Sequence, residues 1–223
     1  MNDLTLVIPV KNEPESLPHV LLELEKLNLN YLIVLEKRDF VTINSIQKYQ
    51  SKIVFQTYKG YGDAISLGLK SVSTKYFLIY NADGSMDPYE ISKFYQKLKE
   101  TKLDLLFGSR YQVGGSSDDD TIITYFGNKI FTLIGNIFFS LPISDILYTY
   151  VMGDTKKTLD LNLKRKDFRF CVELPIKAHR HGLRINDISA REKERIGGTK
   201  KVNAFKDGFL ILLEMLYLFF NRK

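Results

Sequence analysis

Short apolar runs alternate with amphipathic segments through the first half of the chain. The runs that predict buried strands span residues 4–10, 31–35, 53–55, 76–80 and 103–107. Between them apolar side chains recur at helical spacing, beginning with the stripe formed by Leu17, Val20, Leu21, Leu24 and Leu27. Asn12 is expected to cap this first helix, with Glu15 three residues later. The pattern favours an α/β fold whose mostly parallel central sheet is covered by helices on both faces.

The second half of the chain has a different pattern. Residues 114–120 form a polar loop with a short acidic run, and residues 122–141 predict an aromatic-rich helix that is apolar on nearly every side. We expect next a helix over 168–181, a strand over 184–188, a basic loop over 191–201 and a last helix over 203–220. Because no repeat or linker interrupts the chain, we predict one domain over residues 1–223.

Composition and net charge limit which binding partners are expected, but they do not identify one. The 223 residues are 44% hydrophobic and 26% charged, as in ordinary globular proteins. The one cysteine, Cys171, cannot form an internal disulfide, which predicts a reducing, cytoplasmic setting. The formal charge of +6 favours anionic partners such as phosphates, nucleotides or anionic lipid. Nucleic acid is not an expected partner, because no recognition motif accompanies the basic loop.

The apolar C-terminal run raises the question of a membrane. No secretory signal opens the sequence, and the run Phe209–Phe220, interrupted by Glu214, is shorter than an ordinary spanning helix. We expect this segment to dock peripherally on the cytoplasmic face of a membrane, with Lys206, Asp207 and Glu214 on its polar side. The terminal Arg222 and Lys223 would then lie near anionic lipid. Packing on helix 122–141, or a homo-oligomer interface, is the alternative.

Candidate chemistry follows the predicted strands, where ligands of parallel sheets bind. Four strand ends carry it: Pro9–Glu13, Glu36, Asn81-Ala82-Asp83 and Gly108–Tyr111. Gly60 and Gly62 open a helix, but they do not form the dinucleotide fingerprint, because Ile65 stands where its third glycine belongs.

In order and spacing these motifs resemble those of family 2 glycosyltransferases. More narrowly, the chain resembles the dolichol-phosphate mannose synthase and polyprenyl-phosphate glycosyltransferase branch. Gly127-Asn128, Ser144-Asp145, Glu173 and Arg195–Lys200 continue the match, which spans nearly the whole chain. The resemblance implies a GT-A fold that binds a nucleotide-diphosphate sugar over residues 1–111 and an acceptor over 112–202, followed by an amphipathic helix over 203–223.

The resemblance also assigns roles on the donor side. It places Pro9, Asn12 and Glu13 at the nucleoside and Glu36 at the base, and it leaves open whether the donor is of the GDP-mannose or the UDP-glucose type. Asp83 would hold Mg²⁺ or Mn²⁺ on the donor diphosphate, an arrangement that suits ions with few protein ligands. The other donor-binding positions implied are Gly60, Gly62, Asn81, Ala82 and Ser85. Asn81 stands where relatives carry an aspartate, so this site has one negative charge fewer.

Cationic and acidic residues of the second half complete the implied site. Arg110, Arg195 and Lys200 would hold phosphate groups, with Arg110 among the catalytic residues. A phosphate acceptor needs no strong base, whereas a hydroxyl acceptor would need one, for which Asp145 or Glu173 is the candidate. Glu173 is also assigned to substrate binding, and a structural pairing with a nearby arginine is its alternative.

The implied activity is inverting transfer of a hexose to a polyprenyl or dolichyl phosphate. Transfer to a saccharide hydroxyl is one alternative. A degenerate, non-catalytic nucleotide-sugar-binding protein is the other, because Asn81 stands where relatives carry an aspartate and Val151 where they carry an arginine. A further acceptor-side arginine expected near Thr121 is also missing.

Overall fold

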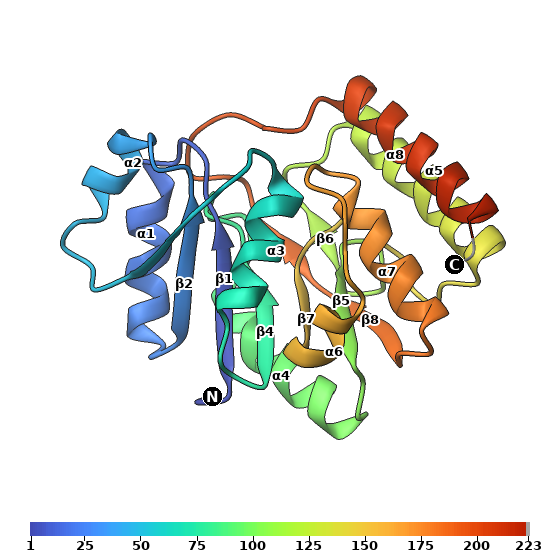
Figure 1. Ribbon diagram of the computed structural model, residues 1–223, viewed down its shortest axis with the longest axis horizontal. Helices are drawn as coiled ribbons and strands as arrows, with labels where there is room; N and C mark the ends of the chain where they lie inside the picture. The colour runs from blue at the N-terminus through green and yellow to red at the C-terminus, as the bar shows by residue number, and fades with distance from the viewer. Residues whose placement is uncertain (222–223) are drawn as a thin grey trace.

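A seven-stranded sheet forms the centre of the computed structural model, which describes residues 1–221 (Figure 1). Its strands lie in the order β3 (Lys52–Phe55), β2 (Asn30–Leu35), β1 (Leu4–Pro9), β4 (Tyr76–Ile79), β7 (Val151–Asp154), β5 (Leu105–Ser109) and β8 (Ile185–Ser189). All neighbouring strands pair in parallel except β7, which is antiparallel to both β4 and β5. The expected mostly parallel sheet is therefore confirmed, and both expected halves of the chain contribute strands to it.

Helices cover both faces of this sheet, as the sequence predicts. Along β1, Leu6 and Ile8 face a core built with α1 (Ser16–Lys26) and α4 (Ile91–Glu100), which a short 3₁₀ turn over Pro88–Glu90 precedes. Val7 faces the opposite core, built with α3 (Tyr61–Ser71) and α7 (Phe170–Arg180). The alternation of neighbouring residues between two cores explains why the strands are apolar throughout.

The second half adds short elements and two long helices. The short ones are α2 (Phe40–Ser45), α6 (Thr155–Asp160) and a parallel pair of strands, β6 (Ser116–Ser117) and β9 (Arg191–Glu192). The long helices are α5 (Ile122–Phe139) and α8 (Ala204–Phe220), which lie side by side at one end of the molecule (Figure 1). The loop between β9 and α8 crosses the carboxyl edge of the sheet on its way to α8.

One local expectation about the chain after β1 is wrong. Asn12 does not cap α1, which begins at Ser16 after Glu15. Instead Asn12 adopts a left-handed conformation with φ of 51°, and its backbone N–H donates to Asp39 at 2.7 Å. This contact across two strand ends replaces the local cap, so Asn12 serves the edge of the sheet rather than the helix.

Cys171 lies buried in the first turn of α7. Burial raises the pKa of its thiol to about 12, so the side chain is a neutral packing residue at physiological pH.

Candidate active site

A cleft lies at the carboxyl ends of β1 and β2. It has a volume of about 330 Å³ and is lined by Asn12, Pro14, Arg38, Asp39, Phe40 and Val41. A second cleft of about 230 Å³ shares Asn12, Arg38 and Asp39 with it and reaches Lys11 and Glu36. Two of the residues expected to contact a nucleoside and its base, Asn12 and Glu36, therefore line adjoining clefts.

Contacts between the β1 and β2 loops fix the shape of this cleft. The Asp39 carboxylate accepts from the backbone N–H groups of Asn12 and, at 3.3 Å, of Thr42, and it thereby caps α2. The Thr42 hydroxyl accepts from the backbone N–H of Glu13 at 3.0 Å. Glu36 is paired with the exposed Arg38 at 2.6 Å, and its side chain is mostly buried. Asp39 and Thr42 were not expected at the site, because in the sequence they follow a run of charges that looks like a solvated turn.

Asp83 lies just beyond the end of β4, next to β1. Its Oδ1 accepts from the backbone N–H of Ser85 at 3.1 Å and from the Ser85 hydroxyl at 2.7 Å. Its Oδ2 lies 3.4 Å from Nη2 of Arg195. Ser85 thus orients Asp83, and one carboxylate oxygen faces the cationic loop.

The two residues before Asp83 differ in exposure. The Asn81 Oδ1 lies 3.1 Å from the Tyr61 hydroxyl, while its amide nitrogen has no partner among residues 1–221. Ala82 is buried in the core, so only its backbone is available to a ligand.

The loop between β9 and α8 closes on these strand ends. The backbone N–H of Ile196 donates to the Asp83 carbonyl at 2.9 Å, and the Lys201 ammonium lies 3.1 Å from the Glu13 carboxylate. Arg195 bridges Asp83 and Asp119, each at 3.4 Å, and Lys200 lies 3.0 Å from the same Asp119 carboxylate. The structure therefore brings Glu13, Asp83, Arg195 and Lys200 together, as expected.

One polar atom of this loop stands out. The Nε of Arg195 is buried and has no hydrogen-bond partner among the described residues. A buried guanidinium N–H without an acceptor is unfavourable, so this donor is suited to an anionic ligand that enters beside Asp83.

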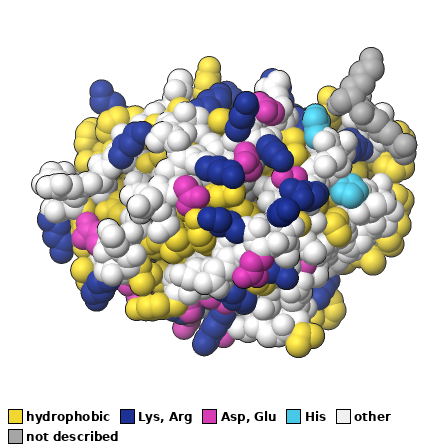
Figure 2. Space-filling view, turned by 90° about the horizontal axis from the view of Figure 1, so that it is seen from below, with side chains coloured by type: hydrophobic (Ala, Val, Ile, Leu, Met, Phe, Trp, Pro, Cys, Tyr) yellow, Lys and Arg dark blue, Asp and Glu magenta, His cyan; other side chains and the backbone are white. Residues whose placement is uncertain are grey.

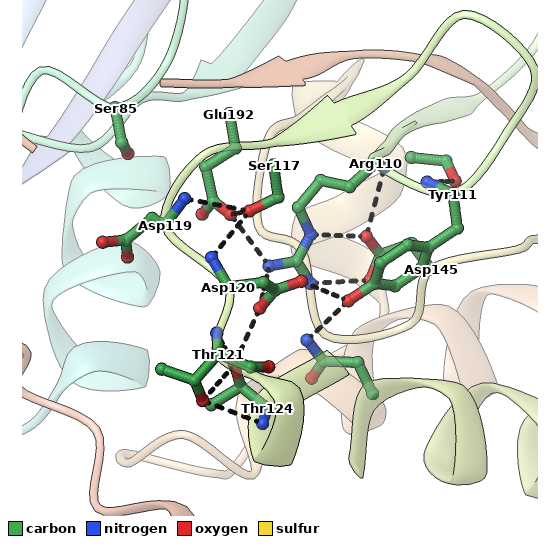
Figure 3. Close-up of polar contacts among 12 residues, drawn as sticks. Ser85, Arg110, Tyr111, Ser117, Asp119, Asp120, Thr121, Thr124, Asp145 and Glu192 are labelled. Atoms are coloured by element: carbon green, nitrogen blue, oxygen red, sulfur yellow. Dashed lines mark hydrogen bonds and ion pairs between the residues drawn. The ribbon is translucent and has the colours of Figure 1, made fainter. Parts of the chain in front are cut away.

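Arg110, at the end of β5, lies in a separate cluster of carboxylates (Figure 3). Its Nε and Nη2 donate to Asp145 at 2.7 and 3.0 Å, and its Nη1 donates to Glu192 at 3.1 Å and lies 3.6 Å from Asp120. The guanidinium is buried, and its described partners are carboxylates. The expectation that Arg110 grips a phosphate directly does not match this geometry, because its donors are already engaged.

Contacts within this cluster also shift the pKa values of Arg110 and Glu192. Burial alone would lower the pKa of Arg110, but Asp145 and Glu192 hold it above its ordinary value. Burial raises the pKa of the Glu192 carboxyl, although Arg110 and the Ser117 hydroxyl act in the opposite direction. Arg110 therefore stays charged and anchors the acidic loop of residues 118–120 beside the strand ends.

Neither residue proposed as a general base is accessible. Asp145 is completely buried against Arg110. Glu173 is buried as well, and it accepts from the backbone N–H groups of Lys164 and Arg165 at 2.8–3.0 Å. Both expectations are wrong for the same reason, since each carboxylate is used to hold another part of the chain in place.

The chain held by Glu173 explains the two glycines before α3. A Cβ added to Gly60 would lie 2.2 Å from the Lys166 carbonyl oxygen, and one added to Gly62 would lie 2.3 Å from that of Arg165. Close packing of two backbones thus accounts for both glycines, and the donor contact that the resemblance implies is not needed to explain them.

The side chains that could coordinate a metal ion are few at this site. Among residues 1–221 no three His, Cys, Asp or Glu side chains are grouped so that they could hold an ion by themselves. Asp83 supplies one carboxylate oxygen at the site. This set fits Mg²⁺ or Mn²⁺, which are commonly bound by one or two carboxylates together with substrate phosphates.

Comparisons with known proteins agree with this picture. The sequence model of the family described as Glycosyl transferase family 2 matches residues 5–158. An uncharacterized glycosyltransferase of Mycobacterium tuberculosis is 27% identical over 209 residues, which cover 94% of this chain and 94% of that protein. An uncharacterized protein of Methanocaldococcus jannaschii is 21% identical over 228 residues, which cover 97% of this chain and 93% of that protein.

Solved structures resemble the chain in fold. Glucosyl-3-phosphoglycerate synthase from Mycobacterium tuberculosis, in complex with Mn²⁺ and uridine-diphosphate-glucose, has a TM-score of 0.73 at 13% identity over 95% of this chain and 78% of that one. The similarity confirms the expected GT-A fold. The narrower resemblance to the dolichol-phosphate mannose synthase branch stays a prediction.

Proposed function

Because this chain belongs to glycosyltransferase family 2, we propose that it transfers a hexose from a nucleotide-diphosphate sugar to a polyprenyl phosphate, with a divalent metal on the diphosphate. The observation that carries the donor part is the convergence of Asp83 and Arg195 at the strand ends, with a buried guanidinium N–H that has no acceptor within residues 1–221. A diphosphate bound at this point would supply that acceptor.

Different residues would bind different parts of the donor. The clefts around Asn12, Asp39 and Glu36 would take the nucleoside, and Asp83, oriented by Ser85, would hold the metal. The bound Mg²⁺ or Mn²⁺ would neutralise the leaving diphosphate. Arg195 would turn from Asp83 to the phosphates, since it cannot remain 3.4 Å from the same carboxylate oxygen that binds a cation.

A phosphate acceptor suits the remaining residues. Its second pKa is about 6, so it is a nucleophile at neutral pH without a base, and both expected bases are buried. The apolar helices α5 and α8 each begin close to the acidic and basic loops of the site, which favours an acceptor with a lipid chain.

A soluble hydroxyl acceptor is the second candidate. The similar solved structures include glucosyl-3-phosphoglycerate synthase bound to phosphoglyceric acid. Asp119, paired with Arg195 and Lys200 at the site, is a carboxylate that could serve such an acceptor as base.

Donor binding is tested by thermal shift with UDP, GDP and their sugars, with and without Mn²⁺. A ligand at 100 times its dissociation constant stabilises the native state by about 2.7 kcal/mol. For a chain of this size that is a rise of roughly 5–11 °C in melting temperature. We expect Asp83→Asn to lose the metal-dependent part of this rise while it keeps the fold.

Asp87→Asn is the matched control, because Asp87 belongs to the same motif but caps the turn at Pro88–Glu90 and binds Lys193. Metal-dependent stabilisation that survives Asp83→Asn unchanged would refute the metal assignment.

The acceptor is tested by transfer of radiolabelled sugar. Label that enters an organic-extractable lipid in the presence of polyprenyl phosphate supports the proposal. Label that enters only phosphoglycerate or another water-soluble acceptor would establish the second candidate instead. Tight donor binding with no donor consumption over a panel of acceptors and metals would indicate a non-catalytic binding protein.

A further inference from the structure

The polarity of α5 is reversed relative to a helix on the surface of a globular protein. Every exposed side chain of α5 is aliphatic or aromatic, and the large ones are Ile122, Ile123, Tyr125, Phe126, Ile130, Leu133, Ile137 and Phe138. Its inward face carries Asn128, Thr132 and Asn136. Surface helices normally place their polar residues toward solvent, so this arrangement needs a nonpolar environment on the outside.

The inward polar residues of α5 are bonded to the rest of the fold. Asn128 donates to the Tyr111 hydroxyl at 2.9 Å, Asn136 donates to the Leu141 carbonyl at 2.6 Å, and the Thr132 hydroxyl accepts from the backbone N–H of Ile146 at 3.2 Å. By length and hydropathy α5 could cross a bilayer, a possibility that the sequence did not suggest, and 22% of it is buried. These bonds fix α5 against the domain, so it would lie on a bilayer rather than pass through it.

Helix α8 has the same reversed polarity. Of its two acidic residues, Glu214 points inward, 2.7 Å from Nε of Arg165, and is 3% exposed. Asp207, in the first turn, is half-buried and accepts from the backbone N–H of Asn203. The expectation that Glu214 lies on a polar face turned to headgroups is therefore wrong, whereas Lys206 in the first turn is exposed as expected. Apart from Lys206, every exposed residue of α8 is nonpolar or Tyr217. Arg222 and Lys223, expected near anionic lipid, lie outside the described residues.

The two helices form one ridge, because α8 packs along α5 and against α7 at the end of the molecule (Figure 1). Packing between them confirms one of the alternatives considered for α8, yet it leaves their outer sides uncovered. At 100° per residue, the exposed positions of α5 from Ile122 round to Phe138 span an apolar arc of about 160°, and the half-buried Lys129 lies at the edge of this arc. A convex apolar arc of this breadth is better matched by a fluid phase than by the flat surface of a rigid partner.

The charged side chains near the ridge indicate which kind of fluid phase the ridge contacts. Residues 191–206 contain six basic and two acidic side chains. Five of the six basic side chains pair with carboxylates near the strand ends, whereas Lys206, in the first turn of α8, is exposed beside the ridge. By contrast, Figure 2, which shows the underside of the molecule as drawn in Figure 1, has basic and acidic side chains interspersed across the face. A strongly apolar ridge with Lys206 in the first turn of α8 and Lys129 in the first half of α5 is complementary to a bilayer that contains anionic lipid.

We propose that the α5–α8 ridge docks on an anionic lipid bilayer, with both helices in the interfacial plane. Because α5 begins directly after Asp120 and α8 shortly after Lys200, docking would hold the mouth of the site next to the headgroups. The proposal concerns the surface alone and stands apart from the donor chemistry.

Co-flotation with vesicles tests the docking. The purified chain is mixed with phosphatidylcholine vesicles that contain or lack phosphatidylglycerol. We expect flotation with the anionic vesicles, and an at least tenfold lower partition coefficient for the double variant Leu133→Ser with Leu216→Ser, whose leucines are 57% and 47% exposed on the ridge. The matched control, Leu22→Ser with Leu159→Ser, changes leucines that are 44% and 37% exposed on α1 and α6 and should stay within twofold of wild type.

Three measurements keep the outcome decisive. Thermal unfolding shows whether each variant is folded, and the single variants Phe126→Ser and Phe220→Ser replace the double variant if it is not. Donor binding without lipid reports on the active site alone, so its failure is separate from a failure to dock. Sedimentation velocity detects self-association. A chain that ignores anionic vesicles, whether it is a monomer or a dimer that the double variant dissociates, would overturn the proposal.

Discussion

Replacing Asp145 with asparagine is expected to destabilise the fold rather than to remove a catalytic group. Asp145 is completely buried and forms two hydrogen bonds with the guanidinium of Arg110, whose own side chain is 7% exposed. Asparagine keeps the shape but removes the charge, and its amide nitrogen would face a guanidinium donor. Arg110 would retain Glu192 and Asp120 as partners.

The size of the effect follows from this burial. Removing one partner of a buried ion pair costs about 3–5 kcal/mol, and the two remaining carboxylates place Asp145→Asn near the lower end, at about 3 kcal/mol. For a chain of this length, about 3 kcal/mol lowers the melting temperature by roughly 6–12 °C.

Asp167→Asn is the matched control because it makes the same change in an exposed pair. Asp167 binds Arg169 at 2.7 Å, but the two side chains are 38% and 30% exposed. Exposed pairs contribute about 0–1 kcal/mol, so this variant should lose under about 1 kcal/mol. Urea unfolding followed by circular dichroism gives both free energies, and initial rates per folded molecule give the activity. If Asp145→Asn unfolded at the wild-type urea concentration and yet transferred no sugar, Asp145 would belong to the chemistry and the structural assignment would be refuted.

Two further predictions concern packing and the closing loop. Gly62→Ala should destabilise the fold by about 1–3 kcal/mol, because the added Cβ would meet the backbone of residues 164–167. Gly127→Ala, which has open space within α5, should stabilise the fold by up to about 1 kcal/mol, and thermal unfolding compares the two variants. Trypsin should cleave after Arg195 and Lys200 more slowly when UDP and Mn²⁺ are bound, because the loop, which already contacts the strand ends, would gain contacts from both residues to the diphosphate. Unchanged cleavage at saturation would contradict a loop that the ligand orders further.

The sequence predicted the parallel part of the fold well because that part is built from local patterns. Each apolar run that was expected to form a strand does so, and its amphipathic partner forms a helix. Strand β7 was missed, because Val151–Asp154 is short, contains a glycine and becomes a strand only by inserting antiparallel between β4 and β5. Pairing of that kind depends on distant residues and leaves no period in the sequence.

The site was predictable where motif residues follow a strand, and unpredictable where loops supply the partners. Asp83 and Glu13 are at the sheet edge as expected. Glu192 was hidden in a basic loop, where an acidic residue resembles a solvated charge, and Asp119 and Asp120 belong to a loop that only the fold brings to Arg110 and Arg195. These acidic residues are distinguished only by their proximity to an arginine in the fold, and the spacing of residues along the chain does not show that proximity.

The charge balance around Asp83 predicts how the neutral side chain of Asn81 affects metal binding. Asp83 and Asp119 face Arg195 and Lys200, so two negative and two positive side chains balance at the strand ends. A metal bound to a diphosphate brings a cation and an anion together, so Asp83 and Arg195 can each change partner without leaving a charge unpaired. Asn81→Asp would add a negative charge beside Asp83 and is expected to strengthen Mn²⁺ binding in the absence of nucleotide, measured by electron paramagnetic resonance titration. The same variant should hold Arg195 more firmly and slow trypsin cleavage there without ligand. Unchanged Mn²⁺ affinity together with unchanged cleavage would show that residue 81 does not contribute to the electrostatics of this site.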